Sequence, residues 1–314
     1  MWFRRPQGIV FSAHIGTPRE NIGDVLSARA IALLERGENT RLFALPKDIG
    51  SSANINVTYG GGGMVRPGFG RREVYRDFLL RNTRWPYRIF GVGLNQDVGT
   101  PSFSEQDITA LNDWVSHAAS VTVRDSATKE FLARFAAIDI AIRPCPTYSI
   151  LVQKHTPQNI ARYEIGVVVS FGHTVTYKKF LPQVEALVAG LWTEVGDNNI
   201  LLICHDEADR TFAKNRFPEL QNVAPKTFEE VAQAYSSVKQ IISLRGHGVV
   251  FAAALRIVCS PVLLCDKMET LYKYHYGVTP PSLTFDVRRH LDYLRRRIVP
   301  INLLPIPEYA EITR

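Results

Sequence analysis

The sequence predicts an α/β protein made of two successive units, each a parallel sheet covered by helices, that face each other across a cleft. Short apolar runs rich in β-branched residues alternate with amphipathic stretches, which is typical of parallel sheets. The alternation pauses in a proline-containing polar stretch near the middle of the chain and then resumes. The length of 314 residues is enough for two domains.

The first unit is expected over residues 1–150. Strands are predicted at 8–14, 41–45, 55–59, 87–92 and 120–124. Helices are predicted at 24–36, 71–81, 104–119 and 126–135. The third of these helices opens with a capping-box pattern, Ser104 followed three residues later by Asp107.

The second unit is expected over residues 151–314. The boundary is placed between Arg143-Pro144-Cys145-Pro146 and Thr156-Pro157-Gln158, because prolines and polar residues favour linkers. Strands are predicted at 164–170, 200–205, 240–244 and 262–265. Helices are predicted at 177–195, 227–237, 248–256, 268–276 and 283–297, the last with a basic end.

The composition is that of an ordinary globular protein, with 46% hydrophobic and 21% charged residues. No apolar run approaches the ~18 residues needed to span a bilayer. The first residues lack the apolar stretch of a secretory signal, so we expect a cytoplasmic protein. The four cysteines have neither C-x-x-C nor zinc-finger spacing, so no disulfide framework and no structural zinc are expected.

The charge balance favours anionic partners. The formal net charge is +7 and the pI is near 9.3, which suits phosphates, acidic glycans, nucleic acid or a lipid surface. Basic residues at 288–290 and 295–297 are interpreted as a solvated helix end that could also attract an anionic membrane surface. Few aromatic residues lie among these arginines, which argues against nucleic acid as a partner.

The strongest candidate site is Arg245-Gly246-His247-Gly248. A predicted strand ends just before it and an apolar helix follows, so the helix N-terminus is expected to bind an anion. Arg245 offers a fork suited to carboxylate or phosphate. His247 can hold or transfer a proton near neutral pH. The alternative is a tight glycine turn in which His247 is only a helix cap.

Two further candidates follow strands of the first unit. Arg124 ends a predicted strand, and Asp125 or Ser126 is expected to cap the next helix. The alternative there is a cap beside a solvated arginine. Asn21 and Asp24 lie between the first strand and the first helix, where Asp24 is either a base or hydroxyl-binding group or a routine N-cap.

Glycine clusters follow two predicted strands, at 60–63 and 91–93. They indicate close approach of the backbone to a phosphate or sugar, with Gly61 and Gly62 as candidate positions. Neither cluster forms G-x-G-x-x-G opening a helix, and no Gly-Lys-Ser/Thr occurs, so a dinucleotide fingerprint and a P-loop are not supported. Residues 205–209 could bind a cation, but the preferred interpretation is a solvated acidic loop, and no metal site is predicted.

Taken in order, these segments resemble the polysaccharide pyruvyl transferase family. The likeness runs from about residue 9 to residue 277, and its specificity lies in the number, order and strand-end placement of short motifs. The motifs are Asn21-Ile22-Gly23-Asp24, Tyr59-Gly60-Gly61-Gly62-Gly63, Phe90-Gly91-Val92-Gly93, Val123-Arg124-Asp125-Ser126, Arg245-Gly246-His247-Gly248, and residues 261–264 followed by Lys267.

The resemblance implies two Rossmann-like domains similar to the GT-B glycosyltransferases, with the donor in the interdomain cleft. The N-terminal domain is expected on the acceptor side and the C-terminal domain on the donor side. The implied activity is transfer of pyruvate from phosphoenolpyruvate, as co-substrate and without another cofactor, to form a cyclic ketal on a sugar of a surface polysaccharide or its precursor. The family's usual setting and the basic tail fit a lipid-linked acceptor at the inner face of the membrane.

The resemblance also assigns residues. Arg124 and His247 match the residues that hold the donor, Arg245 is a second cation nearby, and the N-x-G-D element supplies Asn21 and Asp24. Phosphoenolpyruvate is a trianion near pH 7, so two arginines and a histidine are expected to neutralise it. We assign His247 as the acid or phosphate clamp and Asp24 as the base. The glycines expected to lie against the substrate are Gly61, Gly62 and Gly248.

The chain departs from the family pattern at two positions. Gly246 stands where the family more often has leucine, which is expected to change backbone freedom at the donor site. Cys145 stands where an acidic residue is usual, which puts the contribution of that loop in doubt.

Two other functions remain open. A nucleotide-sugar glycosyltransferase of similar architecture would use the same helix N-terminus for a diphosphate. A non-catalytic glycan- or polyanion-binding protein would use the positive charge alone. An enzyme is preferred because cations follow strand ends and are not confined to a helix face.

Overall fold

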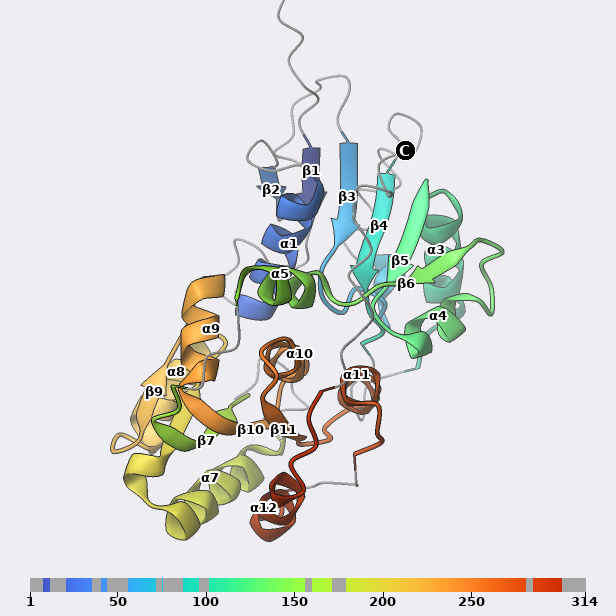
Figure 1. Cartoon of the computed structure of the whole chain (residues 1–314). Coiled ribbons are helices and arrows are strands. Elements are labelled where there is room, and N and C mark those ends of the chain that lie inside the picture. Colours follow the sequence, from blue (N-terminus) through green and yellow to red (C-terminus); the bar gives the residue numbers. More distant parts are fainter. Residues whose placement is uncertain are drawn as a thin grey trace, which may run out of the picture.

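The computed structural model of the chain describes residues 8–11, 21–35, 41–43, 56–71, 75, 87–95, 102–155, 160–170, 179–280 and 285–300. These residues contain two parallel β-sheets, one in each half of the chain, with helices packed against both (Figure 1). The predicted α/β class with two successive sheet-and-helix units is confirmed.

The N-terminal sheet runs in the order β2-β1-β3-β4-β5-β6, and all of its pairings are parallel. Its strands are β1 (Gly8–Phe11), β2 (Arg41–Phe43), β3 (Asn56–Gly60), β4 (Tyr87–Val92), β5 (Ser120–Val123) and β6 (Ile140–Ile142). Parallel pairing brings the carboxyl ends of the strands to one edge, and Figure 1 shows β3 and β4 running toward the C-terminal half. The segments that follow β3, β4 and β5 therefore lie at the junction of the two halves.

Among the described residues, this half also contains α1 (Ile22–Glu35), η2 (Phe69–Arg71), α3 (Glu105–Ser116), α4 (Ser126–Leu132) and α5 (Pro146–Lys154). The predicted capping box is confirmed at α3, where Ser104 and Asp107 each accept the other's backbone N–H. The Asp107 carboxylate also accepts from Gly68 N and Gly70 N, which ties η2 to the start of α3.

The C-terminal sheet has the order β11-β10-β7-β8-β9, again with parallel pairing. Its strands are β7 (Tyr163–Val168), β8 (Ile200–Ile203), β9 (Gln221–Val223), β10 (Val238–Ser243) and β11 (Val258–Pro261). The accompanying helices are α7 (Leu181–Val195), η3 (Asp197–Asn199), α8 (Glu207–Arg216), α9 (Phe228–Ser236), α10 (Gly246–Ala254), α11 (Asp266–Tyr276) and α12 (Val287–Arg295).

One apolar cluster runs across both halves of the molecule. Every residue of α10 is buried, and the helix packs on α5, which in turn packs on α1. The backbone N–H of Ile22 at the start of α1 donates to His205 O in the C-terminal half at 2.8 Å. Each fully buried Leu, Ile or Phe contributes roughly 1.5–3 kcal/mol, so a core shared by several such residues fixes α1, α5 and α10 relative to one another. Its members include Ile22, Leu26, Tyr148, Leu151, Val249, Val250 and Phe251.

Several predicted elements need correction. The strand predicted at 262–265 is wrong, because β11 occupies Val258–Pro261 instead and pairs with β10. β6, α5, α8 and β9 were not predicted. The helix predicted at 71–81 falls largely outside the described residues. The other predicted elements are present with ends shifted by a few residues. The predicted domain boundary at 150 lies inside α5, and the division there stays a prediction.

No helix in the described part of the chain combines the length and the apolar character needed to cross a membrane.

Candidate active site

The candidate site lies where the carboxyl ends of β3, β4 and β5 meet the first turns of α1, α10 and α11. The turns after β3 and β4 are joined by a hydrogen bond from Gly93 N to Gly62 O at 3.1 Å. Gly61 and Gly62 both have φ of +82°, a left-handed conformation that favours glycine. The turn predicted from the glycine cluster at 60–63 therefore requires glycine for its backbone shape.

Arg124 directly follows β5 and is almost completely buried, at 1% exposed. Its Nε lies 3.4 Å from the Asp125 carboxylate, and its Nη2 has no hydrogen-bond partner among the described residues. A Cβ on Gly93 would lie 2.0 Å from Arg124 Nε, so glycine at that position makes room for the guanidinium. The alternative of a solvated arginine is therefore wrong, whereas the predicted N-cap is present, with Asp125 accepting from Thr128 N at 2.8 Å.

His247 lies in the first turn of α10 and is buried against α1. Its Nε2 is 3.2 Å from Ser27 Oγ, and a Cβ on Gly23 would lie 2.1 Å from its Nδ1. The glycine of the N-x-G-D motif therefore makes room for the histidine of the R-x-H-G motif, although the two are far apart in the sequence. Ser27 Oγ also lies 3.8 Å from Cys145 Sγ, so the unusual cysteine touches the residue that holds His247.

The electrostatic environment of His247 is strongly positive. Burial, followed by the charges of Arg124 and Lys267 and smaller contributions from His205 and Arg245, lowers its pKa well below the usual 6.5. In the free protein the imidazole is therefore neutral at pH 7, and its expected role in neutralising the donor stays a prediction. The same shift shows that Arg124, Lys267 and His247 share one electrostatic neighbourhood.

Lys267 is a cation that the site prediction did not include. Its Nζ donates to Asn95 Oδ1 at 3.1 Å, which links α11 to the turn after β4. A Cβ on Gly246 would lie 2.9 Å from Lys267 Cε, so the glycine makes room for the lysine stem. Gly246 does not have positive φ, so the structure shows its effect on space, and the expected change in backbone freedom stays a prediction. The sequence signal that could have identified Lys267 is its position at the start of a helix that follows a strand of the second sheet.

Asn21 and Asp24 have different positions at the start of α1. Asn21 Oδ1 accepts from Gly23 N at 2.8 Å, so Asn21 caps the helix. The helix begins at Ile22, two residues earlier than predicted, and Asp24 is therefore not the N-cap. Asp24 Oδ1 would lie 2.4 Å from a Cβ on Gly62, which places its carboxylate against the turn after β3. A role as base stays a prediction.

Arg245 pairs with two carboxylates of the C-terminal half. Its guanidinium donates to Asp206 and Asp209 at 2.5 Å each and to Val169 O at 2.9 Å. Both carboxylates are buried, so the interpretation of residues 205–209 as a solvated acidic loop is wrong. These contacts give Arg245 a structural function, and direct donor contact by it stays a prediction. Gly248, for its part, lies against Ser243, whose Oγ would be 2.1 Å from a Cβ there.

Replacing Arg245 by methionine is expected to destabilise the protein by about 3 kcal/mol, because two buried carboxylates would lose their partner. The matched control is Arg295→Met, whose ion pair with Asp292 is exposed and should contribute less than about 1 kcal/mol. Urea unfolding of both variants measures the difference. Equal stability of the two variants would show that the Asp206–Arg245–Asp209 cluster is not structural.

Acid is expected to destabilise the folded protein well above pH 4. Burial, followed by the Arg245 charge, lowers the pKa of His205 to about 3, and burial, followed by the Arg124 charge, does the same for His275. The unfolded chain binds more protons below pH 6.5, so this stability is complete above that pH and is lost as pH falls toward 3. At pH 5 the loss is roughly 2 kcal/mol for each histidine. Urea unfolding at pH 7, 6 and 5 measures it, and a flat profile in wild type would contradict both shifts.

Among the described residues, no group of three histidine, cysteine or carboxylate side chains could hold a metal ion.

The fold is similar to that of several enzymes of sugar nucleotides and cell-wall polymers. The UDP-GlcNAc 2-epimerase of Methanocaldococcus jannaschii, solved with UDP-GlcNAc and UDP, gives a TM-score of 0.62 at 11% identity, with 98% of each chain covered. Sucrose-phosphate synthase from Thermosynechococcus elongatus gives 0.56 at 14% identity, covering 93% of this chain and 89% of that one. The wall teichoic acid polymerase TagF gives 0.50 at 11% identity, covering 94% and 82%. These likenesses establish a GT-B-like fold.

Two parallel sheets covered by helices, with the candidate motifs at strand ends of both halves, thus define a GT-B-like protein with its candidate site at the junction. The family model described as polysaccharide pyruvyl transferase matches residues 21–263, well over half of the chain. The chain belongs to the polysaccharide pyruvyl transferase family. A comparison with curated protein sequences finds no match.

Proposed function

We propose that the protein transfers pyruvate from phosphoenolpyruvate to a sugar of a surface polysaccharide or its precursor, forming a cyclic ketal. The observation that carries this proposal is the buried Arg124 guanidinium, whose Nη2 has no partner among the described residues and which shares its surroundings with Lys267 and His247. Two cations next to a neutral imidazole suit a small, highly charged anion. Family membership supports the pyruvyl donor.

The donor's charge explains the residue types. Phosphoenolpyruvate carries a carboxylate and a phosphate, and Arg124 and Lys267 each supply a fixed positive charge at the junction. Arginine offers a planar fork that fits either group, and lysine a compact point charge. Burial and the charges of Arg124 and Lys267 lower the pKa of His247 in the free protein. The negative charge of a bound trianion would raise this pKa again, so we expect the imidazole to gain a proton when the donor binds.

The chemistry then needs one proton donor and one acceptor. Protonated His247 gives its proton to the methylene carbon, which places positive charge on the neighbouring carbon, and a sugar hydroxyl adds there. The phosphate leaves, and a second hydroxyl closes the ketal. Of the two hydroxyl protons, one replaces, through solvent, the proton that His247 gave to the methylene carbon, and the other leaves on the released phosphate. Asp24, against the turn after β3, is the proposed base that accepts a hydroxyl proton.

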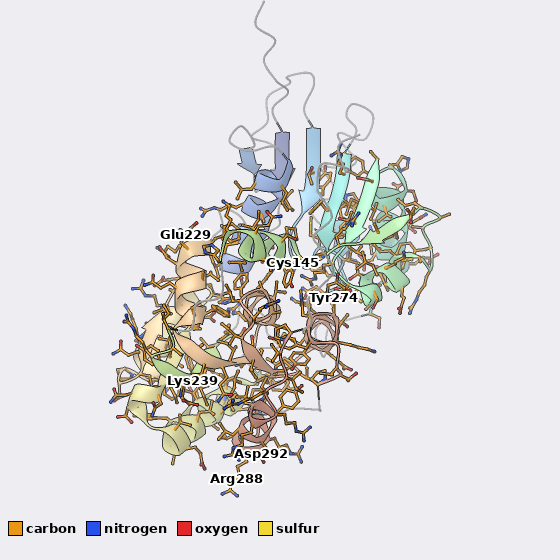
Figure 2. All side chains as sticks on the ribbon, in the orientation of Figure 1. Cys145, Glu229, Lys239, Tyr274, Arg288 and Asp292 are labelled. Carbon is orange, nitrogen blue, oxygen red and sulfur yellow. The ribbon has the colours of Figure 1, made fainter. Side chains whose placement is uncertain are left out.

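We assign the N-terminal half to the acceptor and the C-terminal half to the larger part of the donor site. The acceptor could be lipid-linked, with the protein working at the inner face of a membrane. Arg289 and Arg295 of α12 are exposed, and among the described residues they pair with Asp286, the N-cap of the helix, and with Asp292. Figure 2 shows α12, marked by Arg288 and Asp292, at the end of the C-terminal half away from the N-terminal sheet. A membrane contact there would leave the junction open to substrates.

The test is phosphate release from phosphoenolpyruvate with a panel of galactose-, glucose- and N-acetylmannosamine-containing acceptors. Release should require an acceptor and should yield an acid-labile ketal by mass spectrometry. Absence of release with every acceptor, from protein that melts cooperatively, would contradict the proposal. The panel also identifies the acceptor sugar.

A nucleotide-sugar glycosyltransferase is the second candidate, favoured by the similarity in fold to enzymes that bind sugar nucleotides. Thermal shift separates the two, because a ligand stabilises the protein it binds. Phosphoenolpyruvate should raise the melting temperature at concentrations at which UDP does not. The reverse result would favour the glycosyltransferase, and no shift with either would favour a non-catalytic binding protein.

A further inference from the structure

One face of helix α11 contacts the N-terminal half near both ends of the helix. Lys267, near its start, bonds Asn95 in the turn after β4. His275, near its end, packs its ring on Tyr148 of α5, with ring centroids 4.9 Å apart. Positions separated by eight residues lie close to one helix face. The same face of α11 therefore contacts the N-terminal half at both ends, and Figure 2 shows Tyr274, beside His275, at this junction.

His275 is unusual among the buried histidines. It is 1% exposed, and neither Nδ1 nor Nε2 has a hydrogen-bond partner in the described part of the chain. By contrast, His205 Nε2 lies 3.0 Å from Tyr235 Oη, and His290 Nδ1 lies 2.7 Å from Ser260 Oγ. Buried polar atoms are nearly always hydrogen-bonded, so two unpaired nitrogens on one ring indicate that a bound ligand supplies the missing partner.

Arg124 offers a second unpaired group close by. Its guanidinium lies against Gly93 at the end of β4. Two residues earlier, Gly91 faces Pro146, whose Cδ would be 2.8 Å from a Cβ there. Pro146 opens α5, the helix whose Tyr148 packs on His275. Arg124 and His275 thus flank the place where β4 meets α5.

The electrostatics agree with this geometry. After burial, the charge of Arg124 is the influence that lowers the pKa of His275, to about 3. At neutral pH the ring is therefore neutral, with one N–H donor and one acceptor nitrogen. A neutral ring N–H and the unpaired Nη2 of an arginine are complementary to one anionic group, since both can donate to it.

We propose that His275 is a further donor-binding residue, which donates a ring N–H to the same anionic group that Arg124 Nη2 binds. The inference rests on the proposed function, because the anion is taken to be the carboxylate or phosphate of phosphoenolpyruvate. Arg124 belongs to the N-terminal half and His275 to the C-terminal half, so the bound anion joins the two halves. Both side chains are buried, so the donor enters when α11 and the end of β4 separate.

The test compares wild type with His275→Phe, which keeps a ring on Tyr148 and removes both nitrogens, and His275→Gln, which restores an amide donor. Titration calorimetry with phosphoenolpyruvate should show affinity about 10- to 100-fold weaker for His275→Phe and intermediate for His275→Gln. KM should rise accordingly with a smaller change in kcat. The melting temperature of His275→Phe should equal or exceed that of wild type, because two unpaired buried nitrogens are gone.

His290→Phe is the matched control, since it removes a buried histidine that has a partner in Ser260 away from the junction. It should lower the melting temperature and leave affinity for phosphoenolpyruvate unchanged. Equal affinity of His275→Phe and wild type would overturn the inference, as would weaker binding accompanied by a melting loss like that of the control.

The outcome for the proposed function is separate. If wild type does not bind phosphoenolpyruvate, the proposed donor is wrong, and the same comparison is made with inorganic phosphate by thermal shift. Stabilisation of wild type but not of His275→Phe would then support an anion site at Arg124 and His275. Equal stabilisation of the two proteins, or of neither, would overturn it.

Discussion

Replacing Arg124 by methionine is expected to lower kcat/KM for phosphoenolpyruvate by about 10²- to 10³-fold while the protein stays folded. Loss of one preorganised donor to a developing negative charge typically has an effect of this size. Arg124 Nη2 lacks a partner in the described structure, so its removal relieves a cost of burial, whereas the buried Asp125 carboxylate loses the charge of Nε and keeps its hydrogen bonds from Thr128. These two effects on stability have opposite signs, so the activity should fall far more than the melting temperature.

Two further variants sharpen this prediction. Arg124→Lys keeps the charge but loses the planar fork, and it should recover only part of the activity. Arg134→Met removes an arginine whose guanidinium lies 5.9 Å from the Phe131 ring and should leave kcat/KM unchanged. Steady-state phosphate release measures all three variants. Activity of Arg124→Met within a few-fold of wild type would show that this guanidinium does not hold the donor.

Replacing His247 by glutamine is expected to lower kcat by roughly 10²- to 10⁴-fold, the usual effect of removing a general acid. Glutamine can still hydrogen-bond Ser27 Oγ, so the packing between α1 and α10 should survive. Because burial and the neighbouring cations lower the pKa of His247, the free protein holds this imidazole neutral, and the donor's negative charge raises its pKa. Binding of phosphoenolpyruvate near pH 7 should therefore take up a proton.

Titration calorimetry in buffers of different ionisation enthalpy measures this proton uptake. Wild type should take up close to one proton for each donor bound, and His247→Gln measurably less. Ser27→Ala serves as the control, because it removes the hydrogen bond to Nε2 and leaves the imidazole in place. Proton uptake that is the same in wild type and His247→Gln would assign the uptake to another group and remove His247 from the role of acid.

Much of the fold could be predicted from the sequence, because local patterns determine it. Ser104 and Asp107 form the capping box that their spacing predicts, and the strand over 87–92 has the predicted ends. The secondary-structure predictions are wrong where the local pattern of apolar and polar residues does not distinguish helix, strand and loop. Residues Pro146 to Leu151 of α5 are all buried, so the helix lacks the alternation of apolar and polar faces that marks a surface helix.

The misplaced strand near Pro261 has a similar cause. Apolar runs lie on both sides of this proline, at 257–259 and 262–265, and either could form a strand. The register with β10, in which Gln240 pairs with Val258, selects the first run. Pairing partners lie far apart in sequence, so single-sequence periodicity does not contain this information.

The sequence by itself determined the fold class, the family resemblance and the strand-end positions of Arg124 and His247, because short motifs encode turns and helix starts locally. Only the tertiary structure decided which cations face the junction. Arg245 is two residues from His247, yet its guanidinium is held by Asp206 and Asp209, whereas Lys267, twenty positions after His247, reaches Asn95. The physical reason is that the direction and the pairing of a charged side chain are set by the groups packed around it, and those groups come from distant parts of the chain.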